Sequence, residues 1–138
     1  LKRLGCLNDK QYKIFDLKEM IPAVGQGAIG VEALSKNHRV KEIFARLNCP
    51  STFRCVMEER KIIKKLGGDC GSPIAVFAKE NNKTIKMKAF VGDINGTSSI
   101  RTVANFPEKY SLNAGESVAN TLIKLGALRL VARLKGSK

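Results

Sequence analysis

Apolar residues recur at helical spacing in the middle of the chain. One set predicts a helix over 38–47, which Asn37 can cap at its first turn. A longer set predicts a helix over 51–66 that begins after Pro50. The core-facing residues of this second helix would be Phe53, Val56, Met57, Ile62, Ile63 and Leu66. Its solvent face would carry Glu58, Glu59, Arg60, Lys61, Lys64 and Lys65.

Further along the chain, β-forming residues predict three strands, over 73–78, 84–91 and 99–105. The turn-forming sequences ENNK and GDINGTS separate them, so an antiparallel meander is the simplest topology. Two helices should follow, over 114–125 and 127–134. Region 48–138 is therefore predicted to be an α-β-β-β-α domain of the α+β class, a three-stranded antiparallel sheet with helices on one face.

The first 47 residues have a different character. The apolar segment 28–34 predicts a strand ahead of the helix over 38–47, and we place a domain boundary at the break around Pro50. Gly25, Gly27 and Gly30 match G-x-G-x-x-G, but a strand rather than a helix is expected after them, so we reject a dinucleotide site. What remains is a loop whose N–H groups and Gln26 amide could meet an anion, unless it is a plain turn.

Composition adds a strong positive charge, with 25 Lys and Arg against 12 Asp and Glu, or +13. This balance favours an anionic partner, although a solvated lysine-rich surface would give the same count. Four cysteines form no C-x-x-C pair and His38 is the single histidine, so we expect no metal site and free thiols. With no signal-peptide region and no apolar run near ~20 residues, we expect a cytoplasmic location and no membrane contact. The chain also lacks an initiator Met, which indicates a piece of a longer protein.

One cysteine has an unusual setting. In LGGDCGSPIAV, Cys70 stands among glycines at 67, 68 and 71, whereas core cysteines usually sit among bulky apolar residues. Four segments, LKRLG (1–5), IPAVGQGAIGVEAL (21–34), EER followed by LGGDCGSPIAVFA (66–78), and KAFVGDINGTSSI (88–100), together resemble the C-terminal half of the porphobilinogen deaminase (hydroxymethylbilane synthase) family. The resemblance runs in order over nearly the whole chain.

This resemblance implies a transferase of tetrapyrrole and haem biosynthesis. Such enzymes join four porphobilinogen molecules into hydroxymethylbilane and release ammonia at each step. The growing polypyrrole is held on a dipyrromethane cofactor, bound as a thioether to a cysteine that by motif is Cys70. The fold implied for 1–47 is the last strand and helix of a periplasmic-binding-protein-like α/β domain, the return segment from domain 2 into domain 1. Residues 48–138 would be domain 3.

The resemblance also assigns roles to individual residues. Arg3 resembles a cleft arginine that binds pyrrole carboxylates, and Gln26 with Gly27 resembles the loop that lines the cofactor. Arg60 matches the ER motif, although an exposed ion pair with Glu58 or Glu59 would explain it equally well. Asp69 replaces a usual glycine before Cys70. The family's catalytic aspartate lies on the first domain, so this chain should contain no catalytic residue and should be inactive without the missing N-terminal domains, although the full-length protein would be a monomer.

Two alternatives remain at this point. The order α-β-β-β-α is also that of double-stranded RNA-binding domains, which grip phosphates with lysines near the start of the final helix. This chain carries Glu116 there, and its charge would repel a phosphate backbone. A noncatalytic remnant of the enzyme is the other possibility. The preferred prediction therefore has porphobilinogen and a polypyrrole as ligands, and no nucleic acid.

Overall fold

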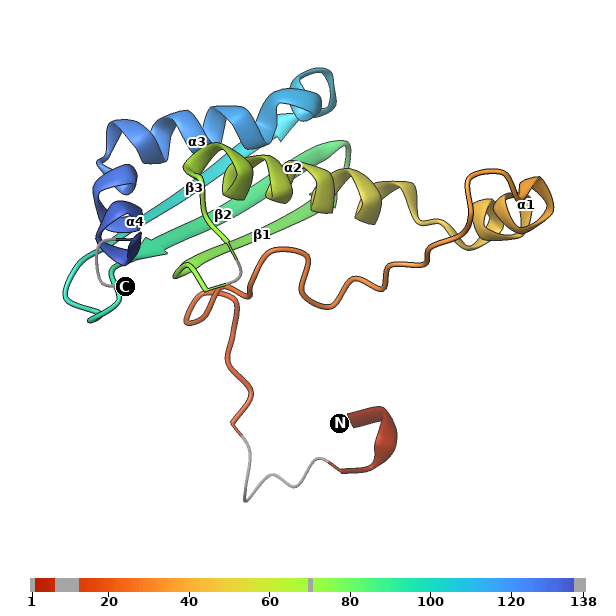
Figure 1. The fold of residues 1–138 in the computed structure, drawn as a ribbon, viewed down its shortest axis with the longest axis horizontal. Coiled ribbons are helices and arrows are strands. Elements are labelled where there is room, and N and C mark those ends of the chain that lie inside the picture. The colour runs from red at the N-terminus through yellow and green to blue at the C-terminus, as the bar shows by residue number, and fades with distance from the viewer. Residues whose placement is uncertain (1, 7–12, 70, 136–138) are drawn as a thin grey trace.

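The chain forms a sheet layer and a helix layer, preceded by a long irregular segment and a small helix (Figure 1). The structure, a computed structural model, describes residues 2–6, 13–69 and 71–135, without the side chains of residues 2 and 133–135. The strands are β1 (Ile74–Asn81), β2 (Thr84–Gly92) and β3 (Ser99–Pro107). The helices are α1 (His38–Leu47), α2 (Pro50–Leu66), α3 (Ala114–Lys124) and α4 (Ala127–Lys135), with two short 3-10 helices, η1 (Lys2–Leu4) and η2 (Glu108–Asn113).

The three strands form the predicted antiparallel meander, in the order β1-β2-β3. In the middle of the sheet Val76 lies opposite Ala89, which in turn lies opposite Thr102. Strands β1 and β2 are joined by Asn82 and Lys83, which both have positive φ, at 45° and 57°. Two left-handed residues are what a two-residue hairpin needs to match the twist of its strands. This turn sets the register, and each strand ends one to three residues later than predicted.

Helices α2 and α3 pack side by side on one face of the sheet, as predicted (Figure 1). The largest fully buried side chains come from these helices and from β1 and β2: Ile62, Val76, Ile85, Met87, Val91, Val118 and Leu122. Among the described residues, those of the buried apolar core all lie between Cys55 and Val131. From the described part of the first 47 residues, Val24 packs partly against this core.

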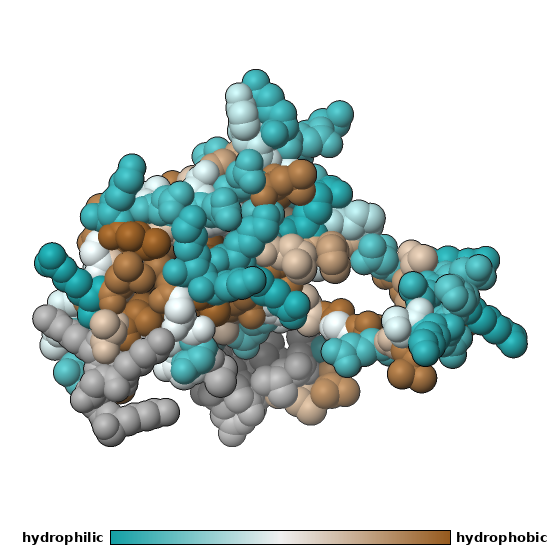
Figure 2. Space-filling model, turned by 45° about the horizontal axis from the view of Figure 1, so that its top comes forward, coloured by the Kyte–Doolittle hydropathy of each residue, from teal (hydrophilic) through white to brown (hydrophobic). Residues whose placement is uncertain are grey.

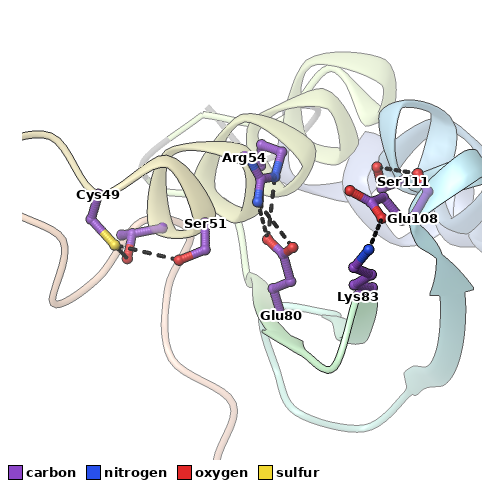
Figure 3. Close-up of polar contacts among 8 residues, drawn as sticks. Cys49, Ser51, Arg54, Glu80, Lys83, Glu108 and Ser111 are labelled. Atoms are coloured by element: carbon purple, nitrogen blue, oxygen red, sulfur yellow. Dashed lines mark hydrogen bonds and ion pairs between the residues drawn. The ribbon is translucent and has the colours of Figure 1, made fainter.

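Polar contacts fasten the layers at the hairpin end. The Arg54 guanidinium donates to both carboxylate oxygens of Glu80, at 2.8 and 2.9 Å, and joins the start of α2 to the end of β1 (Figure 3). Lys83 in the hairpin lies 3.8 Å from the Glu108 carboxylate of η2. The sequence pattern did not predict η2, which connects β3 to α3.

The predicted orientation of α2 is partly wrong. Phe53 and Met57 are 59% and 39% exposed, whereas Glu58 and Glu59, expected on the solvent face, are only 3% and 4% exposed. Cys55, Glu58, Glu59, Ile62 and Leu66 share the buried face because they recur at helical spacing. Burial of the two carboxylates is tolerated because their oxygens accept hydrogen bonds. Glu59 accepts from two backbone N–H groups, and Glu58 accepts from the Gly115 N–H and the Lys61 ammonium.

Within the first 47 residues, α1 has the predicted bounds, and the Asn37 side chain accepts a hydrogen bond from the Val40 N–H at 3.2 Å as the predicted cap. The strand predicted over 28–34 is absent, and its side chains Ile29, Val31 and Leu34 are exposed. A strand requires hydrogen bonds from a neighbour, and no described segment supplies them.

The visible surface is mainly polar. Figure 2 shows hydrophilic side chains over most of this face and hydrophobic side chains gathered at the end where α4 lies. Leu125 and Leu128, at the junction of α3 and α4, are among the exposed apolar residues. Among the helices of the described residues, none is long and apolar enough to cross a membrane.

The contact between α2 and α3 should tolerate no side chain at Gly115. A Cβ there would overlap the backbone carbonyl oxygen of Glu58 and crowd Lys61. We expect Gly115→Ala to lower the free energy of unfolding by about 1–3 kcal/mol, because α3 must move away from α2. Gly30→Ala, where a Cβ meets nothing within 4 Å, is the control and should change little. Urea unfolding followed by circular dichroism measures both; equal effects would contradict the close contact.

Residues 48–138 should fold without the preceding segment. The buried apolar core that the structure describes lies within them, and the described contribution of the first 47 residues is the partly buried Val24. We therefore expect a chain of residues 48–138 to unfold in one cooperative step in urea, with a midpoint slightly below that of the whole chain. A gradual loss of ellipticity with no transition would show that the earlier segment is needed for the fold.

Candidate functional site

The candidate site lies where α2 ends and the loop 67–73 leads into β1. Gly67 ends the helix in the left-handed conformation, with φ at 65°, which a glycine adopts without strain. The Gly68 N–H then donates to the Ile63 carbonyl oxygen at 3.1 Å. The loop thus leaves the helix abruptly and carries few side chains. Cys70 lies outside the described residues, so the structure does not test its predicted role.

Asp69 organises the loop around residue 70. Its carboxylate oxygen Oδ1 accepts hydrogen bonds from the Gly71 N–H at 3.0 Å and from the Ser72 hydroxyl at 2.9 Å. The Ser72 Oγ also accepts a hydrogen bond from the Asp69 N–H at 2.9 Å. Aspartate commonly stabilises turns by binding the backbone two residues ahead. Asp69 therefore has a structural use in this loop.

A groove of about 540 Å³ opens beside this loop. Its apolar wall is formed by Val24, Ile63 and Ile74, and its charged groups are Arg60, Lys64 and Asp69. A second hollow of about 310 Å³ shares Ala23, Ser72 and Ile74 with the groove and extends to Phe90 and Arg101 on the uncovered face of the sheet. The structure therefore brings together three segments singled out in the sequence: the glycine-rich loop, the ER motif and the loop of Cys70.

The glycine-rich loop is a tight turn over 23–28. The Gln26 N–H donates to the Ala23 carbonyl oxygen at 3.1 Å, and the Gln26 side-chain oxygen accepts from the Ala23 N–H at 3.3 Å. Gly25 and Gly27 have positive φ, at 70° and 88°, which explains why glycine stands at both positions. Ala23 and Val24 line the groove, but the predicted binding residues Gln26 and Gly27 do not.

Glu59 connects this turn to the sheet, a role that sequence reasoning missed. Its oxygen Oε2 accepts a hydrogen bond from the Gly25 N–H and its oxygen Oε1 accepts one from the Ala78 N–H, both at 2.7 Å. Burial raises the pKa of Glu59 above its ordinary value of 4.5, although both N–H donors oppose the shift. Its position four residues after Cys55 and three before Ile62 was the available signal, because those residues share one helix face.

Arg60 lines the groove, but Arg3 does not. The alternative explanation, an ion pair of Arg60 with Glu58 or Glu59, is not found among the described contacts. Glu58 pairs with Lys61 at 2.6 Å, and both oxygens of Glu59 accept backbone hydrogen bonds. Arg3 is exposed on η1, and the structure does not bring it to the groove.

Asp93, Cys6, Cys49 and Cys55 do not line the groove. Asp93 accepts hydrogen bonds from the hydroxyl and N–H of Thr97, and the hydroxyl contact is the main cause that lowers the pKa of Asp93. Cys6, Cys49 and Cys55 are free thiols. Hydrogen bonds with Ser51 and Thr52 lower the pKa of the exposed Cys49 to about 7 (Figure 3). Within the described residues, no group of three or more His, Cys, Asp and Glu side chains could hold a metal.

The buried carboxylate of Glu59 predicts a pH dependence. Because its pKa is raised, the folded chain holds the Glu59 proton more tightly than the unfolded chain. The protonation of Glu59 therefore stabilises the folded chain. This stabilisation is complete below pH 4.5 and is lost as the pH rises through the pKa of Glu59 in the folded state. Urea unfolding between pH 4 and 7 should show the wild type losing stability relative to Glu59→Gln as the pH rises. Parallel pH profiles would contradict the shift.

Comparisons with known proteins address the same segments. A family profile described as "Porphobilinogen deaminase, C-terminal domain" matches residues 53–124, and one described as "Porphobilinogen deaminase, dipyromethane cofactor binding domain" matches residues 1–42. The porphobilinogen deaminase of Coxiella burnetii is 40% identical over 135 residues, which cover 98% of this chain and 44% of that protein.

Two further relatives give the same result. The porphobilinogen deaminase of Methylobacillus flagellatus is 37% identical over 97% of this chain and 43% of that protein. That of Acidithiobacillus ferrooxidans is 34% identical over 99% of this chain and 44% of that protein. The chain thus spans less than half the length of these curated relatives. The two profile matches, the aligned relatives and the three-stranded sheet together place this chain in the porphobilinogen deaminase family.

Proposed function

We propose that this chain is the C-terminal part of an enzyme that joins four porphobilinogen molecules into hydroxymethylbilane with release of ammonia, in tetrapyrrole synthesis. The observation that carries the proposal is the groove beside the loop of Cys70, where the glycine-rich turn and the ER motif meet. Relatives named porphobilinogen deaminase that align over nearly all of the chain support it. A cytoplasmic location stays a prediction from the sequence.

Two domains are proposed within the chain. Residues 48–138 would be domain 3, which is supported by a core confined to this region. Residues 1–47 would be the return segment from domain 2 into domain 1, and the exposed Ile29, Val31 and Leu34 fit a strand whose partners lie in the rest of the enzyme. The chain alone should not turn over substrate, because the family's catalytic aspartate is expected on the first domain. Full-length protein should be a monomer.

The dipyrromethane cofactor is proposed to be bound as a thioether through Cys70. The loop fits such a group because Asp69 folds back onto Gly71 and Ser72, and because Gly68, Asp69 and Ser72 of the loop border the groove. When bound, the cofactor would supply the pyrrole to which the substrate is added. The protein groups at this point would orient it, and Ile63 and Val24 would pack against its rings.

Cationic residues would neutralise the carboxylates of the polypyrrole. Each pyrrole carries an acetate and a propionate, so a six-pyrrole chain bears about a dozen carboxylates, which lysine and arginine bind well. Arg60 and Lys64 lie four residues apart on α2 and both line the groove. For Arg3, Gln26 and Gly27, the motif resemblance remains the support for a role in binding the polypyrrole or the cofactor.

The RNA-binding alternative receives no support. In α3, Ala114 and Gly115 are buried, and the Gly115 N–H donates to the Glu58 carboxylate at 2.9 Å. The start of this helix therefore packs against α2 and carries Glu116, so it does not offer cations to a phosphate backbone.

Mass spectrometry of the full-length protein tests the proposed function. We expect the wild type to carry the added mass of two linked pyrroles, and Cys70→Ser to lose it, because a hydroxyl is a far weaker nucleophile than a thiolate. Cys49→Ser is the matched control, since Cys49 is an exposed thiol with a pKa lowered to about 7. Retention of the added mass in Cys70→Ser, or its loss in Cys49→Ser, would overturn the assignment.

A further inference from the structure

Glu59 is a buried carboxylate that joins two segments far apart in the sequence. One oxygen accepts a hydrogen bond from Gly25 in the glycine-rich turn, and the other accepts one from Ala78 in β1. The residue itself is 4% exposed. In this way α2 presents a single side chain that holds the turn on one side and the sheet on the other.

Only an ionised carboxylate can accept both hydrogen bonds without placing a proton against one donor, although its burial raises the pKa of Glu59. Both partners are N–H donors, so both side-chain oxygens must be acceptors. Glutamine would place an NH₂ group against one of the donors and leave a backbone N–H without an acceptor. Burial of an ionised group is costly for folding, so core stability alone does not explain the choice of glutamate. A requirement for the correct position of the turn would explain it.

The turn held by Glu59 forms part of the groove. Ala23 and Val24, directly before Gly25, line it together with Arg60 and Lys64. Gly25 has a φ of 70°, and a Cβ at this position would lie 3.6 Å from Val56 Cγ1, so the turn rests closely on α2. Without the hydrogen bond from Gly25 to Glu59, the main described contact between the turn and the core would be the packing of Val24.

We propose that Glu59 is a positioning residue, which fastens the turn over 23–28 to α2 and β1 and thereby fixes one wall of the groove beside the loop of Cys70. Its direct contacts are with the turn and the strand, and it acts on the ligand through them. The identity of the ligand, a polypyrrole, rests on the proposed function, but the fastening of the turn does not.

Amide hydrogen exchange in the 138-residue chain tests the fastening. In Glu59→Gln, exchange at Gly25 should rise about tenfold or more relative to amides of β2, as expected for a lost hydrogen bond to a charged group. The matched control is Glu58→Gln, an adjacent buried glutamate whose partners are Gly115 and Lys61. It should leave the ratio of Gly25 to β2 exchange unchanged. No rise in Glu59→Gln, or an equal rise in both variants, would overturn the proposal.

A second variant covers the case in which Glu59→Gln does not fold. Gly25→Ala strains the turn from its own side, since an L residue rarely adopts a φ of 70°, while Glu59 and β1 stay intact. We expect faster exchange over residues 23–28 and unchanged exchange at Ala78. Unchanged exchange throughout the turn would show that it is not held in the described geometry and would overturn the proposal.

Kinetics of the full-length enzyme test the consequence for the groove. Glu59→Gln should raise KM for porphobilinogen more than it lowers kcat, because a displaced wall weakens binding. Glu58→Gln should not reproduce this split. An unchanged KM in a variant whose Gly25 amide is released would refute the link to the groove. If the wild-type enzyme lacked the added mass of two linked pyrroles, the proposed function would be wrong. The exchange rate of the Gly25 amide would then still show whether Glu59 fastens the turn.

Discussion

The structure depends on how α2 buries two adjacent carboxylates against backbone N–H groups. Glu58 binds the start of α3 at Gly115, and Glu59 binds β1 at Ala78 and the glycine-rich turn at Gly25. Because both side chains are enclosed, each must satisfy its oxygens within the protein, which restricts how its neighbours can pack. Helix α2 therefore holds α3, the sheet and the turn in fixed positions relative to one another. This arrangement forms the groove beside the loop of Cys70.

Much of the fold could be predicted because local signals and tertiary packing agree. The cap at Asn37, the bounds of α1 and the meander of three strands all follow from short-range patterns that the core reinforces. The rotation of α2 could not be predicted in full, because its apolar residues are distributed around much of the helix. The choice between Phe53 and Glu59 for the buried face is made by backbone donors on distant segments, which no local pattern reports.

The candidate site shows the same division. Motifs indicated the turn, the ER pair and the loop of Cys70, and the structure brings these segments together at one groove. Within the pair, however, the motif drew attention to Arg60, whereas the contacts that hold the site belong to Glu59. The strand expected over 28–34 failed for a different reason. Its apolar residues have the pattern of a strand, but a strand also needs an adjacent strand as hydrogen-bond partner. The described part of the chain contains no such partner for it.

The N-terminal end of α2 gives Cys49 surroundings that favour a thiolate. Cys49 stands at the N-terminal end, where a helix favours negative charge and where Ser51 and Thr52 also bind the sulfur. Ease of alkylation would therefore draw attention to Cys49. If the full-length protein carries the proposed cofactor, its attachment point must therefore be located by a peptide map, because thiol reactivity would single out Cys49 whichever cysteine holds the group.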